Sequence, residues 1–236
     1  HWMVHSFPTR RSSDLPLIRE QLVRRARALV IGDPRREDVD LGPLMHPRFL
    51  GAFLEQRGVG IEDGAELLLD GRRIGASEAP PGFVGDAAQA LYVSPRIFDR
   101  VGPTMRIAQE ECFGPTVNLI EVGSLDEAIA AATATRYALS AAIYTRDARA
   151  MLRFKEEVDA GMISINGPTI GAESHLPFGG NGWSGNGTRE SGIWVLDAYT
   201  RWQAVNVDHS GRLQRAQIDV EAPPFGAAPD LTRLGD

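Results

Sequence analysis

The middle of the chain alternates between two hydrophobic periods. Short apolar runs typical of buried strands are separated by segments whose apolar side chains recur every three or four residues, as on one face of a helix. The strand-like runs are residues 116–122, 138–144 and 162–165, and the helical segments are 124–135 and 147–160. A Ser124-x-x-Glu127 capping box opens the first helix, and Gly161 ends the second. This alternation with short joints predicts an α/β fold, a parallel sheet with helices on both faces.

Weaker patterns lie on either side of this region. Residues 17–29 carry apolar side chains at helical spacing after Pro16, and Gly32-Asp33-Pro34 ends that helix. The other predicted elements are a helix at 46–57, a glycine-rich turn at 58–64, strands at 65–69 and 91–98, and an edge strand at 201–208.

The first fifteen residues do not fit this organisation. Residues 1–15 show neither helical nor strand periodicity. Residues 7–15, FPTRRSSDL, are what TTC CCT ACA CGA CGC TCT TCC GAT CT encodes, a string similar to a common sequencing-library adapter. We therefore expect residues 1–15 to be a non-native scar outside the fold. An unusual native arm is the alternative, and the coding DNA would distinguish the two.

Composition narrows the function classes. Of the 236 residues, 43% are hydrophobic and 24% charged, as in a globular protein of one or two domains. The net charge of −6 disfavours nucleic acid and anionic membranes as partners, and no apolar stretch approaches the roughly 20 residues of a membrane span. The single cysteine, Cys112, excludes an internal disulfide framework and favours a reducing, cytoplasmic setting. The expected partner is a small molecule, with no nucleic acid and no membrane.

The segment Glu110-Glu111-Cys112-Phe113-Gly114-Pro115 precedes the strand predicted at 116–122. A carboxylate at a strand edge can accept hydrogen bonds from both hydroxyls of a ribose, and an adjacent phenyl ring can pack on a flat ring. The pattern also fits a surface acidic pair. Two neighbouring acids raise a thiol pKa, so we interpret Cys112 as a packing residue rather than a nucleophile. No metal site is predicted, because His46, His175 and His209 lack metal-ligand spacing.

A glycine-dense loop follows the strand predicted at 162–165 and its terminal Asn166. Ligands of α/β proteins bind beyond the carboxyl ends of parallel strands, so the loop is either part of a ligand site or an ordinary surface loop. Residues 180–185, GNGWSG, match the pattern G-x-G-x-x-G. A dinucleotide fingerprint needs a strand immediately before it and a helix immediately after it, so we interpret this match as a loop.

Taken together and in order, these segments resemble the C-terminal, catalytic-domain half of the aldehyde dehydrogenase superfamily. The resemblance covers about residues 16–219, and its most specific motifs are Glu110-Glu111-x-Phe113-Gly114-Pro115 and Pro177-Phe178-Gly179-Gly180. The other matching segments are Gly32-Asp33-Pro34, Leu41-Gly42-Pro43-Leu44, Tyr92-Val93-x-Pro95, Ile107-Ala108-Gln109, Arg136-Tyr137-x-Leu139-Ser140-Ala141 and Ala160-Gly161-Met162 through Asn166.

The resemblance implies an enzyme that oxidises an aldehyde to a carboxylic acid with NAD or NADP. In this family a cysteine thiolate attacks the aldehyde, a hydride passes to the cofactor, and base-activated water hydrolyses the thioester. By resemblance, Glu111 holds the nicotinamide-side ribose and Phe113 packs near the nicotinamide. Phe178 lines the aldehyde tunnel, Glu190 lies near the water path, and Asn166 belongs to the substrate pocket.

Two departures from the family pattern matter. The family usually has a lysine where this chain has Gly182, so a charge near the loop is lost. By resemblance, the position of the family's nucleophilic cysteine falls within residues 1–15, which contain no cysteine. The positions of its base glutamate and oxyanion asparagine fall upstream of this chain, so no catalytic residue is assigned here. The chain alone is expected to be inactive. A non-catalytic module for oligomerisation or partner binding, and a coenzyme-A-acylating enzyme, which Glu190 slightly disfavours, are the alternatives.

The resemblance also divides the chain. Residues 16–200 correspond to a truncated catalytic domain, 201–219 to an oligomerisation strand and tail, and 220–236 to a disordered end. The strand is expected to add to a neighbouring subunit's sheet and so give a homodimer or homotetramer. The tail at 213–219 is more weakly similar to relatives that oxidise semialdehydes. Neither the choice between NAD and NADP nor the aldehyde itself follows from these residues.

Overall fold

The computed structural model describes residues 6–8, 15–79, 83–88, 90–171, 173–207 and 209. The predicted disordered end at 220–236, the predicted tail at 213–219 and most of residues 1–15 lie outside these residues. The chain divides into two compact units, His1–Tyr199 and Thr200–Asp236. Each is described by itself.

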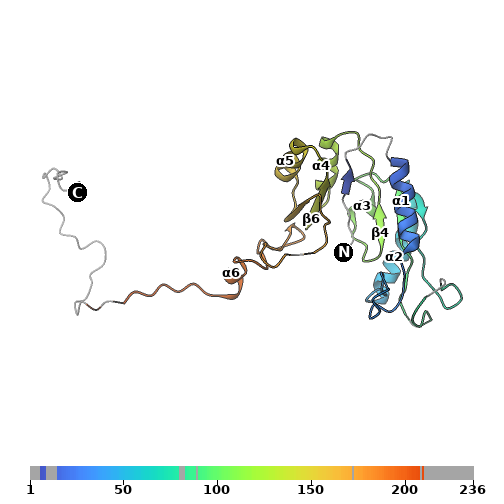
Figure 1. The fold of residues 1–236 in the computed structure, drawn as a ribbon, viewed down its shortest axis with the longest axis horizontal. Coiled ribbons are helices and arrows are strands. Elements are labelled where there is room, and N and C mark those ends of the chain that lie inside the picture. The colour runs from blue at the N-terminus through green and yellow to red at the C-terminus, as the bar shows by residue number, and fades with distance from the viewer. Residues whose placement is uncertain are drawn as a thin grey trace. The chain divides into compact units, whose positions relative to one another are not determined.

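Two parallel strands and two helices form the region with the clearest sequence pattern. β6 (Ser140–Tyr144) pairs in parallel with β7 (Met162–Ile165), as predicted. α4 (Leu125–Thr133) precedes β6, α5 (Ala148–Glu157) joins β6 to β7, and both helices lie beside β6 (Figure 1). The buried core of this region consists of Ile129, Ala141, Ile143, Ala150, Phe154 and Val158.

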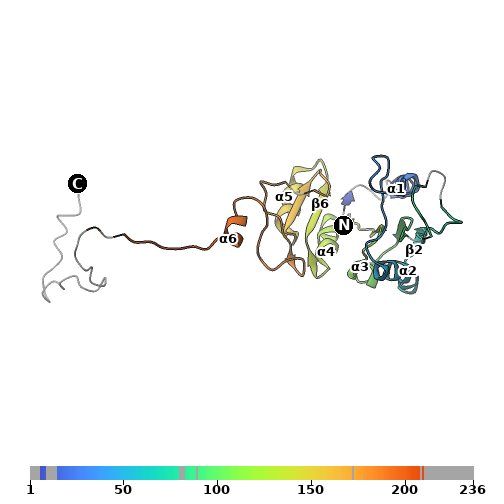
Figure 2. The ribbon, with the colours of Figure 1, turned by 90° about the horizontal axis from the view of Figure 1, so that it is seen from below.

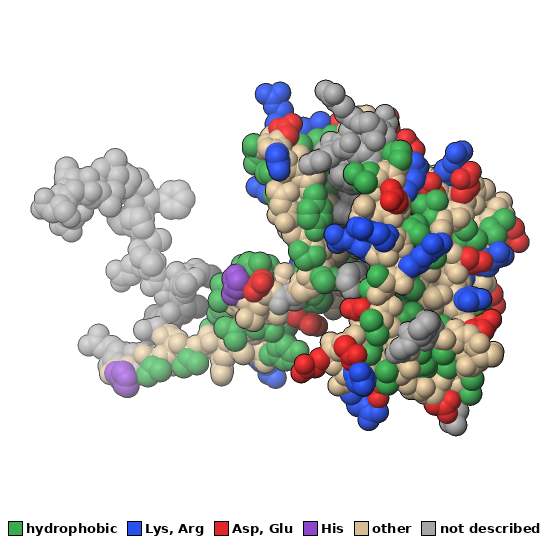
Figure 3. Space-filling model, turned by 45° about the vertical axis from the view of Figure 1, so that its right-hand side comes forward, with side chains coloured by type: hydrophobic (Ala, Val, Ile, Leu, Met, Phe, Trp, Pro, Cys, Tyr) green, Lys and Arg blue, Asp and Glu red, His purple; other side chains and the backbone are tan. Residues whose placement is uncertain are grey.

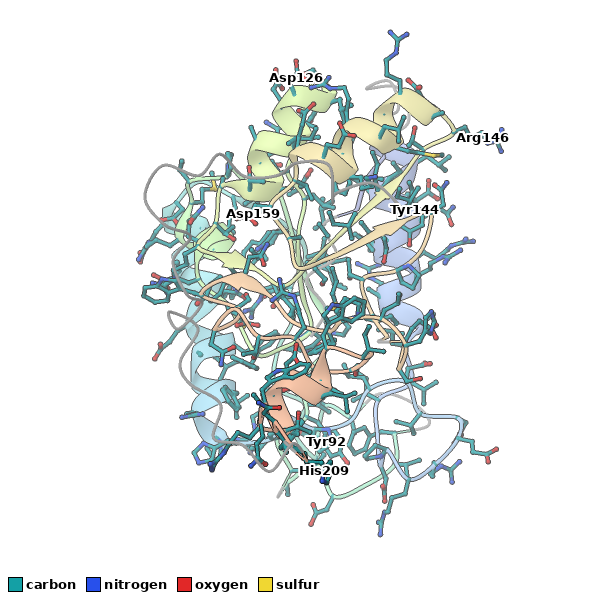
Figure 4. The ribbon with its side chains drawn as sticks, turned by 90° about the vertical axis from the view of Figure 1, so that its left-hand side faces the viewer. Tyr92, Asp126, Tyr144, Arg146, Asp159 and His209 are labelled. Carbon is teal, nitrogen blue, oxygen red and sulfur yellow. The ribbon has the colours of Figure 1, made fainter. Side chains whose placement is uncertain are left out.

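Polar side chains determine where both helices begin. Ser124 Oγ accepts a hydrogen bond of 3.1 Å from the backbone N–H of Glu127, which confirms the predicted N-cap. Asp147 Oδ1 accepts one of 2.9 Å from the backbone N–H of Arg149. Asp126, in the first turn of α4, and Arg146, just before α5, mark these two helix starts in Figure 4.

β1 (Ser6–Pro8) is the third strand of this sheet and pairs in parallel with β6. Residues 6–8 thus form a strand and α1 begins at Leu15, whereas the origin of residues 1–15 as a non-native scar stays a prediction. The physical reason is the edge of β6: its backbone N–H and C=O groups need partners, and an extended segment can supply them whatever its side chains are.

The second sheet contains β2 (Glu66–Leu69), β3 (Arg96–Asp99) and β4 (Thr116–Asn118). β3 is central, antiparallel to β2 and parallel to β4. The prediction that β4 shares a parallel sheet with β6 and β7 is therefore wrong. Hydrophobic periodicity indicates that a segment is a strand, but the strand that pairs with it depends on long-range packing. Here β4 pairs with β3, whose four residues are all buried.

Three helices accompany this second sheet. α1 (Leu15–Ala28) and α2 (Pro47–Glu62) both contact β2, and α3 (Arg106–Gln109) lies against α2 (Figure 2). α2 continues through Gly58 and Gly60, where the sequence predicted a turn. The reason is packing: the ring of Phe98 lies against Gly60 where a side chain would otherwise be, so this glycine permits close contact rather than ending the helix.

The remaining elements of the first unit are short. β5 (Tyr137–Ala138) pairs antiparallel with β8 (Asn181–Gly182), and α6 (Val195–Tyr199) follows the glycine-dense loop. With parallel strands connected through helices, the predicted α/β class is confirmed.

Charged side chains of both signs are interspersed over the face shown in Figure 3. Among the described residues, no helix has the length and apolar character needed to cross a membrane. In the second unit, residues 201–207 form no strand within this single chain, and the side chains of Trp202, Val205 and Val207 are exposed.

Candidate functional site

A cavity of about 440 Å³ lies beside β4. Its walls come from the turn at residues 41–45, from α2 and α3, and from the loop at residues 110–115. Its polar lining residues are Gln56, Glu110, Glu111, Thr116 and Asn118, and its apolar ones include Leu44, Phe49, Ile107, Val117 and Ile120. An apolar cavity of this size with a few convergent polar groups suits a small organic ligand.

Glu111 and Phe113, the two residues predicted to bind a cofactor, both line this cavity. The Phe113 ring is 37% exposed and packs on the Phe49 ring of α2, with centroids 4.8 Å apart and planes inclined by 35°. Glu111 is exposed. A carboxylate and a flat ring, two residues apart, therefore border the same space.

The loop that carries these two residues rests on a buried ring and a buried cation. Phe53 of α2 is fully buried and lies so close to Gly114 that a Cβ there would be 2.6 Å from the ring. The guanidinium of Arg96 lies 4.2 Å from the Phe53 centroid and donates hydrogen bonds to the carbonyls of Phe53 and Gly71. The Arg96 backbone N–H donates to the Pro115 carbonyl at 2.8 Å.

The charge on Arg96 is incompletely neutralised. Its side chain is 1% exposed, and the nearest carboxylate oxygen, on Asp70, is 4.0 Å away. Burial lowers the pKa of the Arg96 guanidinium, although Asp70 partly opposes this. A guanidinium remains charged even so, and the two carbonyls and the Phe53 ring are the groups that stabilise it.

Cys112 also lines the cavity but is half-buried. Burial raises the pKa of its thiol, and the Glu111 carboxylate adds to the effect. The predicted direction is confirmed, but burial is the larger cause and the neighbouring acid the smaller one. Thr116 Oγ1 lies 4.0 Å from Cys112 Sγ and donates a hydrogen bond of 3.0 Å to Gln56 Oε1. Cys112 thus lies in an environment that disfavours a thiolate nucleophile.

The predicted substrate residues form a second group. Phe178 and Glu190 are paired through their backbones, with N–H···O distances of 2.6 Å and 2.7 Å. Asn166 follows β7 in a left-handed conformation with φ 56°, and its Oδ1 accepts a hydrogen bond from the backbone N–H of Thr145. Neither Asn166 nor Phe178 nor Glu190 is among the residues that line the cavity. Their predicted role at a substrate pocket stays a prediction.

Close backbone contacts hold the loop that carries Phe178 and Glu190. Gly161, which follows α5 by several residues, lies against the Gly179 carbonyl with no room for a Cβ. Arg189 donates hydrogen bonds to the carbonyl of Gly180 and to the Asn181 side chain, and so links the two ends of the glycine-dense loop. The prediction that Gly161 ends the preceding helix is wrong, because α5 ends at Glu157. The glycine is needed for the approach of this loop instead.

The G-x-G-x-x-G match at residues 180–185 is a loop, as predicted. Its second and third residues form β8, and the next helix, α6, begins only at Val195. Among the described residues, no group of three or more His, Cys, Asp or Glu side chains is placed to hold a metal ion.

The sequence profile described as the aldehyde dehydrogenase family matches residues 12–205. The chain belongs to this family. It is 38% identical to the alpha-ketoglutaric semialdehyde dehydrogenase of Bacillus subtilis over 189 residues, which are 80% of this chain and 37% of that protein. It is 41% identical to the alpha-ketoglutarate semialdehyde dehydrogenase of Haloferax volcanii over 182 residues, covering 76% and 36% of the two chains.

A solved structure gives the same result. The NAD-dependent aldehyde dehydrogenase from Sinorhizobium meliloti superposes with a TM-score of 0.75 at 32% identity, over 91% of this chain and 38% of that one. This aldehyde dehydrogenase chain therefore spans 36–38% of the length of these three relatives.

Three residues around the cavity were missed in the sequence of this aldehyde dehydrogenase chain. Phe49 and Gln56 lie about two turns apart on one face of α2, and Arg96 begins β3. The helical periodicity of 46–57 could have indicated that Phe49, Phe53 and Gln56 share a face. An arginine at the start of an apolar strand carries no local signal that it is buried.

Proposed function

We propose that this aldehyde dehydrogenase chain binds the nicotinamide ribose of NAD or NADP in the cavity beside β4, as part of an enzyme that oxidises an aldehyde to a carboxylic acid. The proposal depends on one observation: Glu111 and Phe113 line the same cavity. A carboxylate can accept hydrogen bonds from two vicinal hydroxyls, and a phenyl ring can pack on a flat heterocycle. The residues present therefore fit this part of the cofactor. Bound there, the nicotinamide would accept the hydride removed from the aldehyde.

In this proposal Cys112 is not the nucleophile, and the attacking thiolate comes from outside these 236 residues. The half-buried position and raised pKa of Cys112 support this assignment. Phe178, Glu190 and Asn166 are proposed to serve the aldehyde side. A semialdehyde is the proposed substrate class, supported by the names of the Bacillus subtilis and Haloferax volcanii relatives.

The purified 236-residue chain is expected to produce no reduced cofactor when mixed with NAD or NADP and a panel of semialdehydes. The reason is that its sole thiol is Cys112, which is disfavoured as a thiolate. Absorbance of the reduced nicotinamide measures the reaction. Steady turnover that disappears in Cys112→Ser would show that Cys112 attacks the aldehyde, contrary to the proposal.

Replacing Glu111 by glutamine is expected to weaken NAD binding to the chain about tenfold, because a neutral amide loses the charge-assisted hydrogen bonds to the ribose hydroxyls. Isothermal titration calorimetry gives the dissociation constant. Glu20→Gln removes the same charge from an exposed position on α1 and should leave binding unchanged. Equal loss in both variants would point to net charge rather than to a ribose contact. A larger loss of NAD affinity in Glu110→Gln would indicate that Glu110, rather than Glu111, contacts the ribose.

Self-association is part of the same proposal. Residues 201–207 alternate in character, and Trp202, 86% exposed, shows how much apolar surface they present in a single chain. Pairing of this segment with another subunit would cover these side chains and the backbone groups beside them. Light scattering would give the mass of the chain with and without the segment, and an unchanged monomer in both would refute a role in assembly. The lone cysteine also supports a reducing compartment such as the cytoplasm.

A further inference from the structure

Phe49 is a residue of α2 whose ring contacts the loop that carries Glu111 and Phe113. It is in the first turn of α2, where the side chain of His46 accepts a hydrogen bond of 3.1 Å from the backbone N–H of Arg48 and Pro47 begins the helix. One turn later, Phe53 is fully buried. The cap fixes where α2 begins, and the buried Phe53 fixes how the helix is rotated about its axis. Together they determine the direction in which the Phe49 side chain points.

Three neighbouring groups contact the Phe49 ring. The Phe113 ring lies 4.8 Å away between centroids, and the Arg48 guanidinium lies 4.7 Å from the Phe49 centroid. His46 meets it edge-on at 6.4 Å. Both Phe49 and Phe113 line the cavity. The two rings thus form one continuous aromatic wall, in which the helical ring limits the orientations open to the ring on the loop.

We propose that Phe49 is a positioning residue that holds Phe113 flat against the nicotinamide ring, so that the aromatic wall and the Glu111 carboxylate act on one ligand. This inference rests on the proposed function. Phe113 is on a loop and more than a third exposed, whereas Phe49 is on a capped helix. A ring on a regular helix is the more rigid of the two, and it is the one that sets the geometry of the pair.

The test separates the ring of the ligand from its ribose. Nicotinamide mononucleotide carries both, whereas ribose 5-phosphate carries the ribose and phosphate alone. Phe49→Ala in the 236-residue chain is expected to weaken binding of nicotinamide mononucleotide about 2- to 10-fold, the range of a lost aromatic pair, and to leave ribose 5-phosphate unchanged. Phe49→Tyr keeps a ring and should retain the affinity. Phe49→Leu keeps an apolar side chain without a ring and should lose it.

Leu54→Ala is the matched control, because Leu54 is an exposed apolar residue of α2 that does not line the cavity. It should bind both ligands as the unchanged chain does. Saturation-transfer NMR and calorimetry give the affinities, and circular dichroism shows whether each variant is folded; if Phe49→Ala does not fold, the Leu and Tyr variants decide. Unchanged binding of nicotinamide mononucleotide by folded Phe49→Ala and Phe49→Leu would overturn the role of Phe49 alone. No binding of either ligand by the unchanged chain would overturn the proposed function and this inference with it.

Discussion

Replacing Gly161 by alanine is expected to destabilise the chain by at least about 3 kcal/mol. A Cβ at this position would overlap the carbonyl of Gly179 and the Cα of Gly180, which are backbone atoms and cannot rotate away as a flexible side chain can. The glycine-dense loop would have to move, and the pairing of Phe178 with Glu190 would weaken with it. Urea unfolding followed by circular dichroism measures the change in the free energy of unfolding.

The same substitution at Gly58 serves as the control. Gly58 is an exposed residue within α2, and no atom lies within 4 Å of the position that a Cβ would take. Alanine there should stabilise the chain by about 0.5–1 kcal/mol, because it restricts the unfolded chain and favours the helix. A small or favourable effect of Gly161→Ala would show that the loop does not approach this glycine closely.

Arg96→Ala is expected to cost about 3–5 kcal/mol of folding stability. The substitution removes a large, fully buried side chain, two hydrogen bonds to the carbonyls of Phe53 and Gly71, and the contact with the Phe53 ring. Phe53 also supports Gly114, so the loop of Glu111 and Phe113 should lose order. Urea unfolding gives the stability, and nicotinamide mononucleotide binding gives the effect on the cavity.

Arg36→Ala is the matched control for the loss of an arginine. Arg36 is exposed, and its pair with Asp38 at 2.8 Å lies on the surface, where such pairs contribute little. Its effect should stay below about 1 kcal/mol. Arg96→Lys should remain well below the unchanged chain in stability, because one ammonium cannot reproduce the forked donation to two carbonyls. An Arg96→Ala variant as stable as Arg36→Ala would contradict a supporting role for this buried cation.

Local elements were the most predictable part of the fold. The strand at 162–165 agrees with β7 at both ends, and Ser124 caps α4 as the capping pattern predicted. These features depend on side chains and backbone groups within a few residues of one another. The C-terminal end of α2 was missed, because Gly60 serves a contact with Phe98 that no local pattern records.

The site was predictable in part for the same reason. Glu111 and Phe113 are two residues apart, so their joint position on one cavity follows from a short motif. Phe178 and Glu190, predicted for the substrate side, do not line this cavity, and close backbone contacts hold their own loop together. Arg96 could not be identified, because its burial results from α2 and from Gly71, which lies 25 residues away in sequence.

The amino-acid sequence alone determined the family, the α/β class and the chemistry-bearing motif at residues 110–115. Only the tertiary structure decided that β4 pairs with β3, that residues of α2 line the same cavity as the motif, and that Asn166, Phe178 and Glu190 do not line that cavity. The physical reason is the sequence distance over which each interaction acts. Capping and periodicity depend on a few neighbouring residues, whereas the hydrogen bond from Thr116 to Gln56 joins residues 60 positions apart. Such contacts depend on which surfaces of the whole chain pack best together.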